Sequence, residues 1–345
     1  MTAAGRPLVG IETLSALERR ALLAARTAPS AHNSQPWRFR RRADGLELGW
    51  EAERELPHGD PDRHYLFTGL GAAAEAASLG LAVEASSARV EWELDQGARR
   101  VARIRWTPEA APARDRELAS WLEARATTRL PFGRATVPSA ALQTLVGEVE
   151  RCGASLAVVT GSSRLRRFGD LVVEGTERNM ADPLVYEEFC RWLRLGRRER
   201  TTADGLTASV LGFGPVRSLL ARPLMSPAAM TAWRSIGAHR LLAATQRRLA
   251  RSCGAVTLLT ASSSRPGDVF AGGRVMLRVW LAAALGGLRA HPMTAAMDHR
   301  ETRGALAELF GVTADAQMVV CFRLGFGPVG ARAPRRSLAD LIESD

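Results

Sequence analysis

The sequence predicts an α+β protein in which antiparallel hairpins alternate with helices. Three observations lead to this fold class. Two stretches of alternating apolar residues each contain a turn with a glycine, which is typical of β-hairpins. Helical patterns precede both hairpins. A short Pro- and Ala-rich stretch, residues 108–112, follows this set and is the best candidate for a domain boundary.

The elements of the first part follow from the periodicity of the apolar residues. A helix with its apolar face on one side runs toward Pro29, which stops it. In the next helix the small residues, including Gly69, Gly71 and Gly80, would let another helix approach closely. The expected elements are a helix carrying Ile11, Leu14, Leu17, Ala21 and Leu22, a hairpin of 37–42 and 46–50, a helix over 64–86, and a hairpin of 89–94 and 98–106.

The second part alternates helices and strands. We expect helices over 114–126, 140–151 with Ser139 as its cap, 163–180, 238–251, 266–288 and 301–310, and strands over 155–160, 255–261 and 318–324. Between them, residues 182–234 fit neither period for long and contain several glycines and prolines. Because this segment also carries apolar residues such as Trp192, Phe213 and Met225, we expect a lid or arm that packs on the rest.

The composition limits the classes of protein that fit. A chain of 345 residues with 46% hydrophobic residues can hold two globular domains, or one large domain with an insertion. Residues 1–10 show no signal peptide, and the most apolar stretch, 275–288, is too short to span a membrane and contains Arg278. The four cysteines are widely spaced, which favours free thiols in the cytoplasm and no metal site.

All of the basic charge comes from arginine. The 47 basic and 36 acidic residues leave a net charge of +11, and the sequence contains no lysine. A lysine Schiff base and a P-loop are therefore excluded, and any bound anion must be held by guanidinium groups or backbone N–H groups. The arginines are interleaved with acidic residues, so we expect no nucleic-acid partner.

A short polar loop, residues 29–37, joins the first helix to the first strand. Its Ser30, Asn33, Ser34 and Gln35 offer hydroxyl and amide groups that suit the alternating polar atoms of a heteroaromatic ring. The alternative is a turn whose polar side chains satisfy its own backbone.

Three further stretches are candidates for ligand binding. Arg125, Thr127 and Arg129 alternate, so their side chains would lie on one side of an extended backbone and grip an anion, unless they form a solvated surface. Arg335 and Arg336 form a basic pair near the end of the sequence. Residues 286–294 join a glycine-rich helix end to a strand, where a plain glycine cap is the alternative.

Together these stretches resemble the nitroreductase family. The loop matches its flavin-contacting pattern Pro-Ser-x-x-Asn-x-Gln-Pro-Trp, and Arg125-x-Thr-x-Arg129 is similar to its opening motif. The resemblance implies an α+β nitroreductase-like fold and bound FMN, with a backbone N–H of Thr294 or Ala295 next to flavin N5. The implied cofactor-binding residues are Pro29, Ser30, Asn33, Gln35, Arg125, Thr127, Arg129, Met293, Thr294, Ala295, Arg335 and Arg336.

Each flavin motif occurs once, on opposite sides of the candidate boundary. Ordinary nitroreductases are homodimers in which each flavin touches both subunits. The resemblance therefore implies two fused halves, residues 1–110 and 111–345, with one FMN site kept, as in the single-chain Acg-type branch of the family. We expect a monomer with an internal pseudo-dimer or a weak homodimer.

The resemblance implies an oxidoreductase that passes hydride from NAD(P)H through FMN to a flat, electron-poor aromatic or heterocyclic acceptor. The flavin would carry the chemistry, so no catalytic acid or base is assigned to the protein. The alternative is a protein that holds FMN in a lid-covered site with little turnover. The identity of the acceptor does not follow from the sequence.

Overall fold

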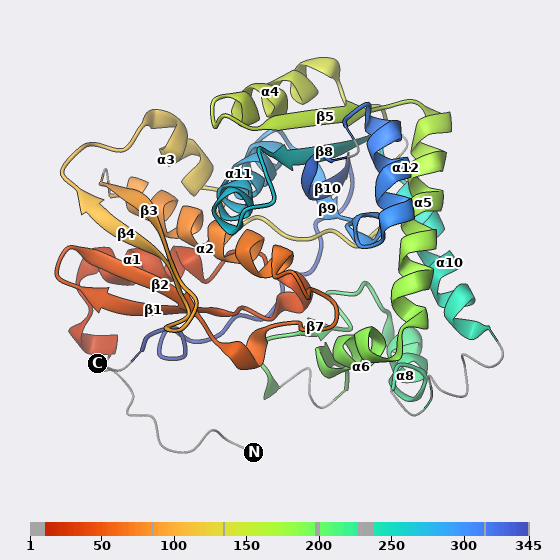
Figure 1. The fold of residues 1–345 in the computed structure, drawn as a ribbon, viewed down its shortest axis with the longest axis horizontal. Helices are drawn as coiled ribbons and strands as arrows, with labels where there is room; N and C mark the ends of the chain where they lie inside the picture. The colour runs from red at the N-terminus through yellow and green to blue at the C-terminus, as the bar shows by residue number, and fades with distance from the viewer. Residues whose placement is uncertain are drawn as a thin grey trace.

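Two four-stranded antiparallel sheets form the framework of the protein, with helices packed between and around them. The computed structural model describes residues 11–84, 86–133, 135–196, 201–226, 229, 237–313 and 315–343. Figure 1 shows the two sheets on either side of the helices α2 and α11. The predicted α+β class with antiparallel sheets is confirmed.

The first sheet has the strand order β1-β2-β4-β3 and belongs to the first 110 residues. The predicted hairpins are both present, and α1 begins at a capping box that Ser15 and Glu18 form, a signal that the apolar pattern did not include. The elements are η1 (Ile11–Thr13), α1 (Ala16–Ala25), η2 (Ala31–Asn33), β1 (Trp37–Arg42), β2 (Gly45–Trp50), η3 (Ala52–Arg54), α2 (His64–Ala82), β3 (Ser87–Asp95) and β4 (Arg100–Thr107).

The second sheet has the order β5-β8-β10-β9 and lies wholly after residue 112. Its elements are α3 (Ala113–Ala119), α4 (Ser139–Glu150), β5 (Ser155–Val159), α5 (Ser162–Ala181), α6 (Pro183–Arg191), β6 (Leu193–Arg194), β7 (Leu206–Thr207), α8 (Pro215–Leu224), α10 (Ala238–Arg251), β8 (Ala255–Ala261), α11 (Pro266–Leu285), β9 (Arg289–Pro292), η4 (Ala295–Met297), α12 (Arg300–Phe310) and β10 (Gln317–Gly325).

Two predictions for the chain after residue 112 are wrong. The helix expected over 114–126 ends at Ala119, and turns then lead into an extended segment from Arg125. Ser139 is the first residue of α4 instead of its cap, because Pro138 occupies the cap position and makes no side-chain capping bond.

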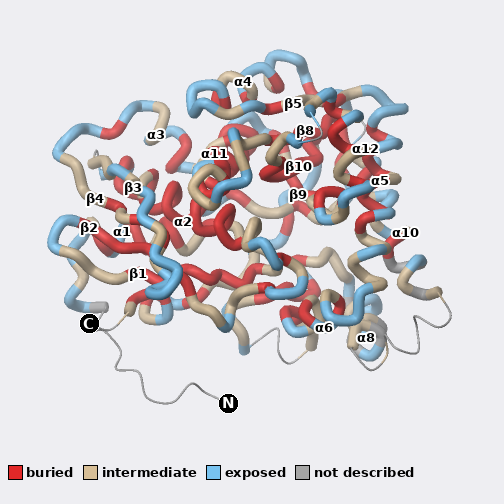
Figure 2. Tube along the Cα trace, in the orientation of Figure 1, coloured by how far each residue is buried: buried red, intermediate tan, exposed pale blue. Residues whose placement is uncertain are grey.

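The helices α2 and α11 pack against each other through glycines. A Cβ atom on Gly71 would lie 2.0 Å from the carbonyl oxygen of Phe270, and one on Gly273 would lie 2.1 Å from that of Thr68. The backbones therefore touch directly, as the small residues of α2 predicted. The largest hydrophobic cluster runs through this contact from Trp37 in β1 to Phe322 in β10, and the two helices form the buried centre of the molecule in Figure 2.

The last described residues return to the first sheet. The Phe39 N–H donates to the Leu341 carbonyl at 2.7 Å, and the Glu343 N–H donates to the Phe39 carbonyl at 2.8 Å. This return carries Arg335 and Arg336 from the second part onto the loop that precedes β1.

The described part of the segment 182–234 includes the helices α6 and α8 and a small two-stranded sheet. Asp182 caps α6 by accepting from the N–H groups of Leu184 and Val185, and Pro183 follows as the first helical residue. Residues 197–200, 227–228 and 230–234 of the segment lie outside the described residues, as do residues 1–10. None of the helices described reaches the length and apolarity required to cross a membrane.

We predict that Gly273→Ala lowers the free energy of unfolding by roughly 1–3 kcal/mol, because the new methyl group would displace the α2 backbone. The matched control is Gly304→Ala in α12, where a Cβ meets nothing within 4 Å; it should be neutral or stabilising by up to about 1 kcal/mol. Urea unfolding of both variants measures this, and equal stabilities would contradict the tight packing.

Candidate functional site

The loop after α1 has an unusual backbone. His32, Asn33 and Gln35 have φ values of 50°, 56° and 49°, in the left-handed region that residues other than glycine seldom adopt. The Ser30 hydroxyl accepts from the Gln35 N–H at 2.9 Å, and the Asn33 side-chain amide donates to the carbonyls of Gly205 and Pro334 at 3.1 and 3.0 Å. Strain of this kind gathers at ligand sites, where the surrounding contacts hold it in place.

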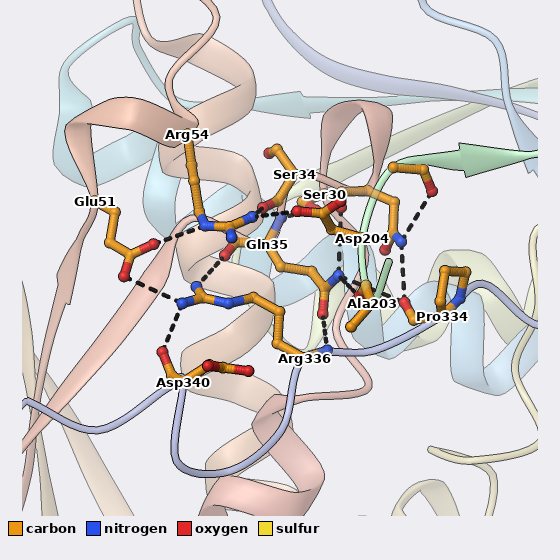
Figure 3. A network of polar contacts seen from close by, with 12 residues as sticks. Ser30, Ser34, Gln35, Glu51, Arg54, Ala203, Asp204, Pro334, Arg336 and Asp340 are labelled. Atoms are coloured by element: carbon orange, nitrogen blue, oxygen red, sulfur yellow. Dashed lines mark hydrogen bonds and ion pairs between the residues drawn. The ribbon is translucent and has the colours of Figure 1, made fainter. Parts of the chain in front are cut away.

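Gln35 and Arg336 hold this loop instead of lining a cavity. Gln35 donates through its side chain to the Ala203 carbonyl at 2.9 Å and accepts from the backbone N–H of Arg336 at 3.0 Å. The Arg336 guanidinium donates to the Gln35 carbonyl and pairs with Glu51 at 3.1 Å (Figure 3). Their polar groups are thus engaged within the protein, and the direct cofactor contact that the motif implied for both stays a prediction.

The segment 125–129 is held in place by a buried arginine of β10. Arg323 is 0% exposed, and its guanidinium donates to the carbonyls of Thr128 and Leu130 at 2.8 Å each. Thr128 faces the interior, where its hydroxyl accepts from the Gly330 N–H. Because successive side chains of an extended backbone point to opposite sides, those of Arg125, Thr127 and Arg129 point away from the side of Thr128, and they line a cavity.

That cavity, which we name the arginine-end cavity, has a volume of about 260 Å³. It lies between the loop after α1, the segment 125–129 and the C-terminal return. Its polar lining includes Ser30, Asn33, Thr127, Arg125, Arg129, Arg335, Arg26 and Arg332. The sequence analysis did not single out Arg26 and Arg332, because neither belongs to a recognised motif.

Three of these guanidinium groups form no ion pair with a carboxylate of the described residues. Arg125 is buried and Arg129 and Arg335 are half-buried, and Glu123, which also lines the cavity, is exposed. Burial lowers the pKa of Arg125 to about 9, with help from the nearby charge of Arg335, and burial lowers the pKa of Arg129 and of Arg335 to about 10. All three remain cations at neutral pH. Arg335 donates to the carbonyls of Ala28 and Thr27 and to the side-chain oxygen of Asn33.

Arg125 is the least satisfied of the three. One of its terminal nitrogens donates to the Thr27 carbonyl at 2.8 Å, and its guanidinium lies 4.4 Å from the centre of the Trp280 ring. Its Nε and Nη1 atoms are buried and have no hydrogen-bond partner within the described part of the chain. An unpaired buried cation is costly, so this arrangement fits an anionic ligand.

A second cavity adjoins the first and shares Pro29, Ser30, Thr127 and Arg129 with it. Its volume is about 340 Å³, and we name it the ring-end cavity. Its lining is mostly apolar and includes Trp280, Phe189, Met180, Met276, Val172 and Val319, together with His32, Tyr65, Asn179, Asp298, Met293, Thr294 and Ala295.

The turn after β9 presents backbone donors to the ring-end cavity. The Met293 N–H donates to the Cys321 carbonyl at 2.9 Å, which leaves the N–H groups of Thr294 and Ala295 as the candidate donors. The turn is held by α5, where a Cβ on Gly175 would lie 2.0 Å from the Ala295 carbonyl oxygen.

The structure thus brings together residues that are up to 306 positions apart in the sequence, from Pro29 to Arg335. Of the residues that the motifs implied, Gln35 and Arg336 alone do not line the two cavities; Pro29, Ser30, Asn33, Arg125, Thr127, Arg129, Met293, Thr294, Ala295 and Arg335 do. Among the described residues no cluster of three metal-ligating side chains is found.

The chain is similar to members of the nitroreductase family, as the motifs indicated, and that resemblance is confirmed by a curated relative. The relative is "Putative NAD(P)H nitroreductase Rv3131" of Mycobacterium tuberculosis, 29% identical over 332 residues, which cover 94% of this chain and 90% of the relative. No family model matches the chain.

Solved structures of nitroreductases also align with part of the chain. One is the FMN-dependent nitroreductase NfnB from Mycobacterium smegmatis in complex with NADPH, at 14% identity and a TM-score of 0.41, covering 66% of this chain and 98% of that one. Another is a nitroreductase with bound FMN from Bacteroides fragilis, at 13% identity and a TM-score of 0.38, covering 64% of this chain and 94% of that one.

We predict that His32 makes stability depend on pH. Burial, with the charge of Arg129, lowers the pKa of His32 from 6.5 to about 4, so the unfolded chain binds a proton more readily than the folded one. Stability therefore falls as the pH drops from 6.5 toward 4. His32→Asn, which tolerates the left-handed backbone, should flatten this slope in urea unfolding at pH 7 and pH 5.

The exposed His58→Asn variant is the control and should keep the slope of the wild type. An unchanged slope in His32→Asn would show that His32 is not held neutral beside Arg129.

Proposed function

We propose that this protein binds one FMN across the two cavities and carries hydride from NAD(P)H to a flat, electron-poor small molecule. The observation that carries the proposal is the group of unpaired guanidiniums of Arg125, Arg129 and Arg335 beside an apolar slot. The name of the relative, an NAD(P)H nitroreductase, supports the choice of donor.

The arginine-end cavity suits the phosphate of FMN. The unpartnered Nε and Nη1 of Arg125 can donate to phosphate oxygens, and Arg335 adds a second guanidinium. The hydroxyls of Ser30 and Thr127 supply neutral donors at the same cavity. A dianion would offset the charge of these side chains, which their own surroundings do not neutralise.

The ring-end cavity suits the flavin ring. When bound, FMN would accept a hydride and pass two electrons on. Arg129 lies where the two cavities meet, so its cation would favour negative charge on the near edge of a ring. Trp280 and Met276 provide apolar surface, and the N–H of Thr294 or Ala295 would donate to a ring nitrogen.

The proposed site joins two halves, residues 1–110 and 111–345. The loop with Ser30 and Asn33 comes from the first, whereas the segment 125–129 and Arg335 come from the second. We therefore propose an internal pseudo-dimer of the Acg type that functions as a monomer or weak homodimer in the cytoplasm. The free cysteines are consistent with that compartment.

The described part of the segment 182–234 would act as a lid. Phe189 of α6 lines the ring-end cavity and its ring lies 5.5 Å from that of His32, and Leu206 and Val210 line the arginine-end cavity. The acceptor would be an aromatic or heterocyclic small molecule thin enough to enter beneath this cover.

We predict that FMN binds with one molecule per chain and that Arg125→Gln weakens binding roughly 10- to 100-fold, since a charge-assisted hydrogen bond is lost. Flavin fluorescence titration of the apoprotein measures both quantities. The exposed Arg247→Gln is the matched control and should bind FMN like the wild type. Two flavins per chain, or equal affinities in both variants, would contradict the proposal.

Anaerobic addition of NADPH or NADH to the yellow protein separates an enzyme from a flavin-holding protein. We predict that the flavin absorbance near 450 nm bleaches within seconds and returns when a quinone is added. A protein that binds FMN but is not bleached by either nucleotide would hold the cofactor with little turnover. This is the second candidate function, and it is favoured by Phe189 of α6, which lines the ring-end cavity beside His32.

A further inference from the structure

A polar cluster lies in the lining of the ring-end cavity. The Tyr65 hydroxyl, from the start of α2, donates to Oδ1 of Asp298, which follows η4. The side-chain amide of Asn179 in α5 donates to Oδ2 of the same carboxyl at 2.7 Å, and Nε2 of His299 lies 2.7 Å from Oδ1 of Asn179. None of these four side chains is among the residues proposed to bind FMN.

The cluster is next to the place where an acceptor would be reduced. Tyr65, Asn179 and Asp298 line the same cavity as Thr294, and the Thr294 side chain is hydrogen-bonded to the Tyr65 hydroxyl. Thr294 also carries one of the two candidate N–H donors for the flavin ring. A flat molecule stacked in the cavity would therefore have its edge near the Tyr65 oxygen.

The Tyr65 hydroxyl keeps its proton, and Asp298 connects it to solvent. Burial and the nearby carboxyl of Asp298 raise the pKa of Tyr65 well above 10. Asp298 itself is exposed, and its two oxygens accept from the Tyr65 hydroxyl and the Asn179 amide, as those of a carboxylate do.

Two-electron reduction of a carbonyl, quinone or nitro acceptor requires a proton that hydride does not supply. The hydride brings both electrons and one hydrogen, and an oxygen of the acceptor must gain a second hydrogen as a proton. A hydroxyl already positioned at the cavity can deliver that proton.

We propose that Tyr65 is the acid that protonates the acceptor and that Asp298 restores the proton. The O–H bond of Tyr65 breaks as an O–H bond forms on the acceptor, whose electrons come from NAD(P)H. A proton from solvent then passes through the exposed Asp298 carboxylate to the phenolate oxygen. Asn179 and His299 are positioning residues that fix the carboxyl. This assignment rests on the proposed function and adds a residue role to it.

A purely structural role for the cluster makes a different prediction. The same hydrogen bonds tie α2, α5 and the turn after β9 together, so loss of the Tyr65 hydroxyl could simply loosen the site. Such loosening would slow every acceptor alike. Proton delivery affects only those acceptors that gain a proton, and this difference separates the two roles.

The test compares two acceptors on the FMN-loaded protein with NADPH. Menadione gains a hydride and a proton, whereas ferricyanide gains one electron and no proton. We expect Tyr65→Phe and Asp298→Asn to slow menadione reduction roughly 100-fold and to change ferricyanide reduction less than about twofold. Tyr186→Phe is the matched control, because Tyr186 is buried in α6 and lines neither cavity, although its ring packs against that of Phe189.

Equal losses with both acceptors, or no loss with menadione, would overturn the assignment. A second measurement does not depend on turnover. The sequence contains only two tyrosines, Tyr65 and Tyr186, so ring-labelled protein gives two sets of tyrosine signals in NMR spectra. We expect menadione added to the oxidised FMN-loaded protein, and separately the Asp298→Asn substitution, to shift the Tyr65 signal and leave the Tyr186 signal in place.

The two measurements also separate this assignment from the proposed function. If the wild-type protein reduces neither acceptor, the proposed function fails, and the NMR result alone decides whether Tyr65 contacts a molecule in the cavity. If both acceptors are reduced and the Tyr65 signal does not respond to menadione, the role of Tyr65 fails while the proposed function stands.

Discussion

The convergence of guanidiniums on one cavity, without a carboxylate partner among the described residues, constrains this structure most. Many other arginines pair with carboxylates, as Arg278 does with Glu75, Asp115 and Glu148, and the buried Arg323 donates to the carbonyls of Thr128 and Leu130. Arg125 and Arg335 instead converge on one cavity with only carbonyl and amide oxygens as partners. Cations in low-dielectric surroundings raise the energy of the folded protein, and a bound anion removes much of that cost. An anion bound in this cavity would therefore stabilise the folded chain.

Contacts between parts of the chain that are far apart in the sequence bring these guanidiniums together. The direct backbone packing of α2 and α11 brings the two sheets close, and the C-terminal return pairs with β1 and carries Arg335 to Asn33. Arg323 fixes the segment 125–129 through the carbonyls on its inner side. The guanidiniums come from after residue 112, whereas the loop that borders them comes from before residue 108. The site therefore depends on the folding of the whole chain.

Much of the fold followed from periodicity, since both hairpins and the long helices have strong apolar patterns and clear turn residues. The alternation of Arg125, Thr127 and Arg129 also predicted a shared face. Gln35 and Arg336 could not be judged in this way, because a motif does not say whether a polar side chain faces a ligand or its own backbone. Tyr65 and Asp298 were missed because only tertiary packing brings them together from 233 residues apart. The early end of α3 was missed because residues 120–126 keep a helix-compatible composition.

The most direct test of the account is a crystal structure of the protein grown with FMN. The account predicts one FMN per chain, with its phosphate within hydrogen-bonding distance of the Arg125 and Arg335 guanidiniums and its ring in the slot beside Trp280 and Thr294. Density for FMN at any other surface, a second FMN in the same chain, or a phosphate that leaves the Nε and Nη1 atoms of Arg125 without a partner would contradict it.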